Sequence, residues 1–211
     1  MKTDDLIDLL VTDPPPRWRL RSTLAIAVAG AVVAAAAVFF AAVGVRPDFA
    51  EAVGSGRFLF KFVVTITLAI AAIAAALEVA RPDGRLARRG LALAIAPALG
   101  ACAVAGELML LPDSEWMRRL VGSNARVCLT VIPLLAAGPL VCLVAALRYG
   151  APANPGQAGA IAGIAAGAIA ATFYAASCTD DSPLFVMTWY PIAILIVSAA
   201  GYLVGRALLR W

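Results

Sequence analysis

Six long apolar segments constrain the fold of this chain more than any other feature of its sequence. They cover about residues 22–44, 58–80, 90–111, 126–147, 156–176 and 184–207. An α-helix needs roughly 20 apolar residues to cross a bilayer core of about 30 Å. Because backbone polar groups in lipid must find partners within their own segment, each apolar segment is expected to be a helix. The sequence therefore predicts an all-α, polytopic membrane protein with six transmembrane helices.

The composition of the chain argues against several classes of function. Hydrophobic residues make up 63% of the chain, more than a soluble domain carries, and there is no histidine. Histidine is the commonest general base and metal ligand, and the sequence has no glycine-rich phosphate loop. The net charge of +4 comes with arginines beside the apolar segments, which argues against a direct nucleic-acid partner. We therefore expect a membrane protein that is not an enzyme and requires no cofactor.

The positions of the basic residues predict how the helices are oriented. Eleven lysines and arginines fall on the side of the membrane that holds the N-terminal tail, and six fall on the other side. The positive-inside rule then places both termini in the cytoplasm and the loop between the fifth and sixth segments outside. The predicted organisation is a cytoplasmic N-terminal tail, residues 1–21, followed by a six-helix transmembrane domain, residues 22–211.

The N-terminal tail mixes acidic and apolar residues ahead of three prolines. The residues concerned are Asp4, Asp5, Leu6, Ile7, Asp8, Leu9 and Leu10. A short helix beginning at Thr3 would place Leu6 and Leu10 on one face, but a helix of this length is marginal alone in water. Two interpretations stay open, a frayed or membrane-lying tail and a helix that binds in the groove of a cytoplasmic protein. The acidic residues argue against contact with an anionic membrane surface.

Two cysteines are the candidate reactive groups. In the predicted topology, Cys128 near the start of the fourth segment and Cys178 at the end of the fifth share a depth on the oxidising side. They can form a disulfide, bind a soft metal ion as thiolates, or do neither. Two thiols alone make an incomplete metal site, which Asp180 or Asp181 would complete. The deeper cysteines, 102 and 142, are expected to be buried and to act as small hydrophobic residues.

An acidic residue within a predicted span needs an explanation of its own. Glu107 lies in the third segment, about one turn from its outer end. A carboxylate in lipid is costly, so it marks either a functional site or an ion-paired acid, for which Arg126 is a candidate partner. A small transporter or channel with Glu107 in its permeation path is the alternative function, and a scaffold protein is a third.

The fifth segment carries glycines at a spacing that favours close helix packing. Gly159, Gly163 and Gly167 recur every four residues and so share one helix face. Small residues at this spacing let the backbone of another helix approach closely. The partner helix can belong to the same chain or to a second copy, so a homo-oligomer is one of the expected assemblies.

Several short motifs, taken in order, identify a family resemblance over essentially the whole chain. The motifs are Lys2-Thr3-Asp4-Asp5-Leu6 through Leu10, Asp13-Pro14, Arg46-Pro47-Asp48, Cys128 with Ile132 and Pro133, and Cys178 with Asp181-Ser182-Pro183, Phe185, Trp189 and Tyr190. In their order and spacing they resemble the NrsF-type membrane anti-sigma factors of proteobacteria. Members often carry histidine just before the second cysteine, where this chain has Ser177. That departure leaves thiol chemistry rather than a strong metal site.

The resemblance implies a function that the residues alone do not give. It implies that the chain holds an extracytoplasmic-function sigma factor inactive at the bacterial inner membrane until metal or oxidative stress releases it. Cys128 and Cys178 would then sense the stimulus, with a metal ion acting only transiently. The N-terminal tail becomes the candidate sigma-binding segment, and membrane lipid surrounds the helices.

Overall fold

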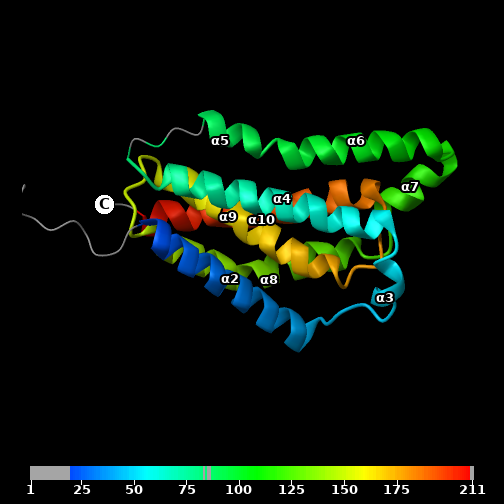
Figure 1. Ribbon diagram of the computed structural model, residues 1–211, viewed down its shortest axis with the longest axis horizontal. Coiled ribbons are helices and arrows are strands. Elements are labelled where there is room, and N and C mark those ends of the chain that lie inside the picture. Colours follow the sequence, from blue (N-terminus) through cyan, green and yellow to red (C-terminus); the bar gives the residue numbers. More distant parts are fainter. Residues whose placement is uncertain (1–19, 83, 85–86, 210–211) are drawn as a thin grey trace, which may run out of the picture.

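The computed structural model describes residues 20–82, 84 and 87–209, and every regular element in that part of the chain is a helix (Figure 1). The helices are α2 (Leu20–Ala42), α3 (Phe49–Ala52), α4 (Gly56–Val79), α5 (Ala87–Ala92), α6 (Ile95–Leu110), α7 (Asp113–Val121), α8 (Ala125–Leu147), α9 (Pro155–Ala175) and α10 (Pro183–Leu208). The predicted helix of the N-terminal tail lies outside the described residues. It therefore stays a prediction.

Six helical stretches of the described chain are long and apolar enough to cross a membrane. They are Leu20–Ala42, Gly56–Val79, Gly90–Leu110, Asp113–Leu147, Pro155–Ala175 and Pro183–Leu208. The all-α fold with six candidate spans is thus confirmed, although the ends of the spans differ from the predicted ones. The fourth stretch is longer than predicted because it includes α7, whose acidic first turn and basic last turn suit the helix dipole.

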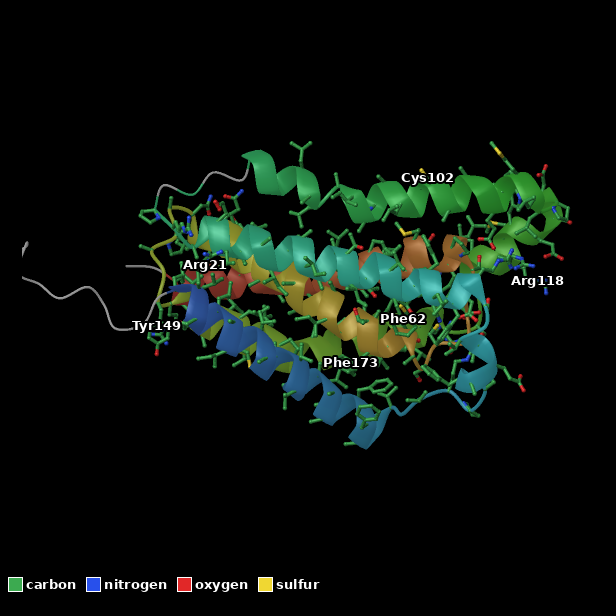
Figure 2. The ribbon with its side chains drawn as sticks, viewed as in Figure 1. Arg21, Phe62, Cys102, Arg118, Tyr149 and Phe173 are labelled. Carbon is green, nitrogen blue, oxygen red and sulfur yellow. The ribbon has the colours of Figure 1, made fainter. Side chains whose placement is uncertain are left out.

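The bundle has two distinct ends (Figure 1). One end is formed by α3, α7 and the loop between α9 and α10, and we call it the cysteine end because Cys178 lies in that loop. The start of α2 and the end of α10 lie together at the opposite end, which we call the terminal end. Figure 2 shows Arg21 and Tyr149 at the terminal end and Arg118 at the cysteine end. Which end faces the cytoplasm stays a prediction.

Helix α9 is the buried centre of the bundle. It packs against α4, α8 and α10, and most of its side chains are glycine or alanine. Small side chains allow neighbouring helices to surround α9 closely. The peripheral helices α2 and α6 instead expose large apolar side chains, among them Ile26, Phe40 and Met109. Exposed apolar surface of this kind suits a lipid environment better than water.

The glycine stripe predicted on the fifth segment packs against α10 of the same chain. A Cβ atom placed on Gly163 would lie 2.6 Å from the Cα atom of Ser198, and Gly159 and Gly201 face each other more closely still. The hydroxyl of Ser198 donates a hydrogen bond to the Ala160 carbonyl at 3.1 Å. The partner helix is therefore intramolecular, and any second copy of the chain would have to use another surface.

Candidate functional site

The loop from residue 176 to 182 is the centre of the candidate site. It begins where α9 ends in a tight turn, with the Cys178 amide donating to the Tyr174 carbonyl at 3.0 Å. It ends at Pro183, which suits the first turn of α10 because proline has no N–H to satisfy there. The Arg46 amide donates to the Ala176 carbonyl at 3.1 Å, so the loop also contacts the segment that follows α2.

The structure brings together the two cysteines that the sequence singled out. Cys128, at the start of α8, is 0% exposed, and Cys178 is 2% exposed. Both thiols are free, and they lie within electrostatic range of each other and of the Tyr174 and Tyr190 hydroxyls. The two tyrosine rings are 5.8 Å apart. The arrangement is a thiol pair closed to bulk water and walled by aromatic rings.

The environment of Cys178 favours the protonated thiol. Burial raises the pKa of the Cys178 thiol, because a thiolate removed from water loses its hydration. The neighbouring Lys61 ammonium acts in the opposite direction but does not cancel the effect of burial on this pKa. The sulfur also lies 3.8 Å from the Asp180 carbonyl oxygen, to which it donates weakly. In its resting state Cys178 is therefore a shielded and weakly nucleophilic group.

Lys61 on α4 is a residue of this site that the sequence analysis used only to predict topology. Its side chain is 0% exposed, and its Nζ atom lies 2.6 Å from Asp181 Oδ1 and donates to the Cys178 carbonyl at 2.8 Å. Nζ also lies 5.0 Å from the centre of the Phe58 ring. A buried ammonium without partners would be strongly unfavourable, so these contacts allow Lys61 to lie inside the protein. Its position within an apolar segment was the sequence feature that could have identified it.

Arg46, which follows α2, shares the Asp181 carboxylate with Lys61. Its Nη1 atom lies 3.0 Å from Asp181 Oδ2 and donates to the Cys178 carbonyl at 3.3 Å. Its Nε and Nη2 atoms donate to Asp48 at 2.7 Å and 2.6 Å. Hydrogen bonding between the two side chains lowers the pKa of Asp48 and raises the pKa of Arg46. We name Arg46, Asp48, Lys61 and Asp181 the ionic cluster.

Asp180 is used to hold the start of α8. Its Oδ2 atom accepts hydrogen bonds from the backbone amides of Ser123 at 3.0 Å and Asn124 at 2.8 Å. Over the described ranges, no group of three or more cysteine, aspartate or glutamate side chains is arranged to hold a metal ion. Asp180 and Asp181 both have other partners. The metal site predicted from the two cysteines and these two carboxylates therefore stays a prediction.

Glu107 on α6 is a buried, ion-paired acid, which is one of the two predicted alternatives. Its Oε2 atom accepts from the Ser182 hydroxyl at 2.7 Å and from the Leu184 amide at 3.0 Å, at the start of α10. Its Oε1 atom lies 3.7 Å from Arg57 and 3.8 Å from Arg119. These two arginines, rather than the expected arginine at position 126, are its ion-pair partners among the described residues. Glu107 therefore ties α6 to the end of the Cys178 loop.

The two remaining cysteines lie outside this site. Cys102 is exposed on α6 (Figure 2), so the prediction that it is buried is wrong. Cys142 on α8 is partly buried, and its sulfur would lie 3.8 Å from a Cβ atom placed on Gly30 of α2. Among the ion pairs of the described residues, none involves a neighbour of Cys102 or Cys142 in the way that Asp181 neighbours Cys178. They serve below as internal comparisons for the thiol pair.

The fold and the site define an all-helical protein with six candidate membrane spans, whose distinctive chemistry is a buried thiol pair held beside a cluster of charges. The family described as "Negative regulator of sigma F", NrsF, matches residues 10–211. This chain belongs to the NrsF family, which confirms the resemblance seen in the sequence motifs.

Two curated relatives match over the full length of both chains. The chain is 35% identical over 220 residues to the anti-sigma-F factor NrsF of Caulobacter vibrioides (strain NA1000 / CB15N). It is 30% identical over 220 residues to the probable anti-sigma-F factor NrsF of Azospira oryzae (strain ATCC BAA-33 / DSM 13638 / PS). No solved structure matches the chain. The family consists of regulatory proteins, so the prediction that this chain is not an enzyme is confirmed.

Proposed function

We propose that this chain is an anti-sigma factor that holds an extracytoplasmic-function sigma factor at the bacterial inner membrane and releases it when Cys128 and Cys178 are modified. Membership of the NrsF family supports the sigma-factor partner. The single observation that carries the sensing part is the burial of both thiols together in one site at the cysteine end.

The N-terminal tail is the segment that we propose binds the sigma factor. Helix α2 begins at Leu20 at the terminal end of the bundle, so the tail joins the described chain at that end (Figure 1). Leu6 and Leu10 would enter an apolar groove of the sigma factor, while Asp4, Asp5 and Asp8 would meet basic residues at its rim. The basic residues on the same side of the membrane favour a cytoplasmic location for this end.

Modification of the thiol pair would disturb a densely packed site. Oxidation of Cys128 and Cys178 to a disulfide removes two electrons and two protons, which an external oxidant accepts. Binding of a thiophilic metal ion removes the two protons without electron transfer. A disulfide draws the two sulfur atoms to bonding distance, and a bound metal ion adds volume to a site in which each sulfur is almost fully enclosed. The neighbouring loop would therefore have to move.

The experiment uses native membranes that contain the full chain and its sigma factor. The membranes are treated with a thiol oxidant such as diamide, and the sigma factor left on the pelleted membranes is measured. We expect the wild-type membranes to lose most of their sigma factor and the C128S/C178S variant to keep it. The C102S/C142S variant is the matched control, and it should respond like the wild type. An equal loss from C128S/C178S would overturn the sensing proposal.

The ion pairs of Glu107 bear on the alternative function. Its carboxylate is held at the cysteine end by two arginines and by the start of α10. These contacts account for the acid within this span, so no permeation path is needed to explain it. We therefore do not propose a transporter or channel.

A further inference from the structure

The ionic cluster joins three parts of the chain that are far apart in sequence. Asp181 comes from the Cys178 loop, Lys61 from α4, and Arg46 from the segment after α2. Asp181 lies 2.6 Å from the lysine and 3.0 Å from the arginine, so one carboxylate holds both cations. The position of the loop is therefore linked directly to the positions of two other elements.

Lys61 depends on the Cys178 loop for its polar partners. Its Nζ atom contacts the carboxylate of Asp181 and the carbonyl of Cys178, and both groups belong to the loop. Because its side chain is 0% exposed, water cannot replace these partners. A loop that moved away would leave a buried, unpaired ammonium, which is strongly unfavourable. The lysine therefore holds the loop in one position, and a forced movement of the loop must also displace the lysine or its helix.

Arg46 links the same loop to α2. Its backbone amide and its guanidinium both contact the loop, at the Ala176 and Cys178 carbonyls respectively. Helix α2 has 23 residues, which corresponds to a length of about 35 Å. A rigid helix of this length reaches from the segment beside the ionic cluster to the terminal end, where the N-terminal tail is attached (Figure 1). Movement at the cysteine end can therefore be transmitted to the tail.

We propose that Lys61 is the positioning residue that couples the thiol site to α2. It holds the Cys178 carbonyl and the Asp181 carboxylate in the resting arrangement. When modification of Cys178 displaces the loop, the carboxylate leaves both cations and Arg46 no longer holds the end of α2. The last step, release of a partner from the tail, rests on the proposed function, whereas the link between Lys61 and the loop does not.

The first test measures the link without any partner protein. The full chain is purified in detergent, labelled with N-ethylmaleimide, and the modification of Cys178 is followed by peptide mass spectrometry. We expect K61M and D181N each to accelerate labelling at least tenfold, because the loop is no longer held closed. Arg118 is an exposed arginine at the cysteine end that pairs with Glu115 on its own helix, so R118Q is the matched control and should label like the wild type.

Two features of this test separate a positioning role from general damage. The Lys61 ammonium lowers the pKa of Cys178, so loss of its charge alone would slow the reaction. Faster labelling therefore reports exposure of the thiol. Labelling of Cys142, on α8, should stay unchanged in a correctly folded variant. The double variant K61M/D181N should accelerate labelling by less than the product of the two single effects, because the two side chains share one ion pair. Unchanged labelling of Cys178 in both single variants would overturn the positioning role.

The second test adds the sigma factor and follows its retention on membranes without any oxidant. We expect K61M and D181N to retain less than a third of the wild-type amount, and R118Q to retain all of it. Full retention by both variants that expose Cys178 would overturn the coupling to α2 but leave the proposed function intact. If the wild-type chain itself retains no sigma factor, the proposed function fails, while the labelling results still decide the role of Lys61.

Discussion

At the scale of single residues, the site combines a shielded thiol with a buried cation. Cys178 and Lys61 are both almost fully enclosed, and the lysine donates to the carbonyl of the same cysteine. The sequence identified the cysteine as a candidate reactive group, because it lies beside acidic residues at the end of an apolar segment. It did not identify the partners of Lys61, because these come from residues more than a hundred positions away. The rotation of α4 about its axis decides which of these distant residues the Lys61 side chain faces.

The protonation of Cys178 gives a pH-dependent prediction. Because its pKa lies above the ordinary value of 9.0, the folded protein favours the neutral thiol up to a higher pH than the unfolded chain does. The rate of alkylation of Cys178 should therefore keep rising with pH beyond 9.0 in the folded protein. In the denatured chain the rate of alkylation should level off once the pH exceeds the ordinary thiol pKa of 9.0. The measurement is the pH profile of labelling of this cysteine by mass spectrometry, and coincident profiles would contradict the buried thiol.

The same shift in pKa has a consequence for stability. A group whose folded pKa is raised contributes stability below its unfolded pKa and loses that contribution as the pH rises towards the folded value. We expect the melting temperature in detergent to fall as the pH rises above about 9, because the Cys178 thiol ionises more readily in the unfolded chain than in the folded protein. Cys178→Ala should show a smaller fall over the same range. An identical fall in both proteins would assign the effect to other groups.

At the scale of helices, Glu107 fastens α6 and α7 to the start of α10. Its two carboxylate oxygens face different partners, one the α10 amide of Leu184 and the hydroxyl of Ser182, the other two arginines. The apolar segment and its acid were predictable from sequence. The choice of Arg57 and Arg119 as ion-pair partners was not, because it depends on the tilt of α6 against α4 and on the separate helix α7.

Substitution of Glu107 should separate these two kinds of contact. Glutamine keeps an acceptor for the Leu184 amide and loses only the ion pairs, which are long at 3.7 Å and 3.8 Å. We expect E107Q to destabilise the fold by about 1 kcal/mol, and E107L by about 2–3 kcal/mol because a buried amide is left without an acceptor. The measurement is unfolding of the purified protein in detergent. Equal destabilisation by the two variants would contradict the assigned roles.

The contact between α9 and α10 makes a graded prediction about glycine. A Cβ atom on Gly163 would lie 2.6 Å from the backbone of α10, whereas one on Gly167 would lie 3.3 Å from Ile194 and one on Gly106 would meet nothing within 4 Å. We expect G163A to destabilise by about 1–3 kcal/mol, G167A by less, and G106A not at all. Melting temperatures in detergent provide the order, and a G163A protein as stable as G106A would contradict the packing.

At the scale of the whole molecule, an even number of candidate spans brings the start of α2 and the end of α10 to one end and leaves the thiol site at the other (Figure 1). This division was predictable, because apolar segments long enough to cross a bilayer can be counted in the sequence. An even number of spans returns the chain to the side on which it started. The assembly of the cysteine end was predictable only in part. The proximity of Cys128 and Cys178 could be predicted from their similar depth in the apolar segments. The ionic cluster could not, because it depends on contacts between helices that the periodicity of the sequence does not determine.

We propose that this chain holds a sigma factor through its N-terminal tail. The most direct measurement is co-purification from the native membrane in mild detergent, comparing the full chain with a chain that lacks residues 1–16. We expect a sigma factor to accompany the full chain and to be absent from the truncated one, with the same amount of folded membrane protein in both samples. A sigma factor that binds both chains equally, or neither, would contradict the claim.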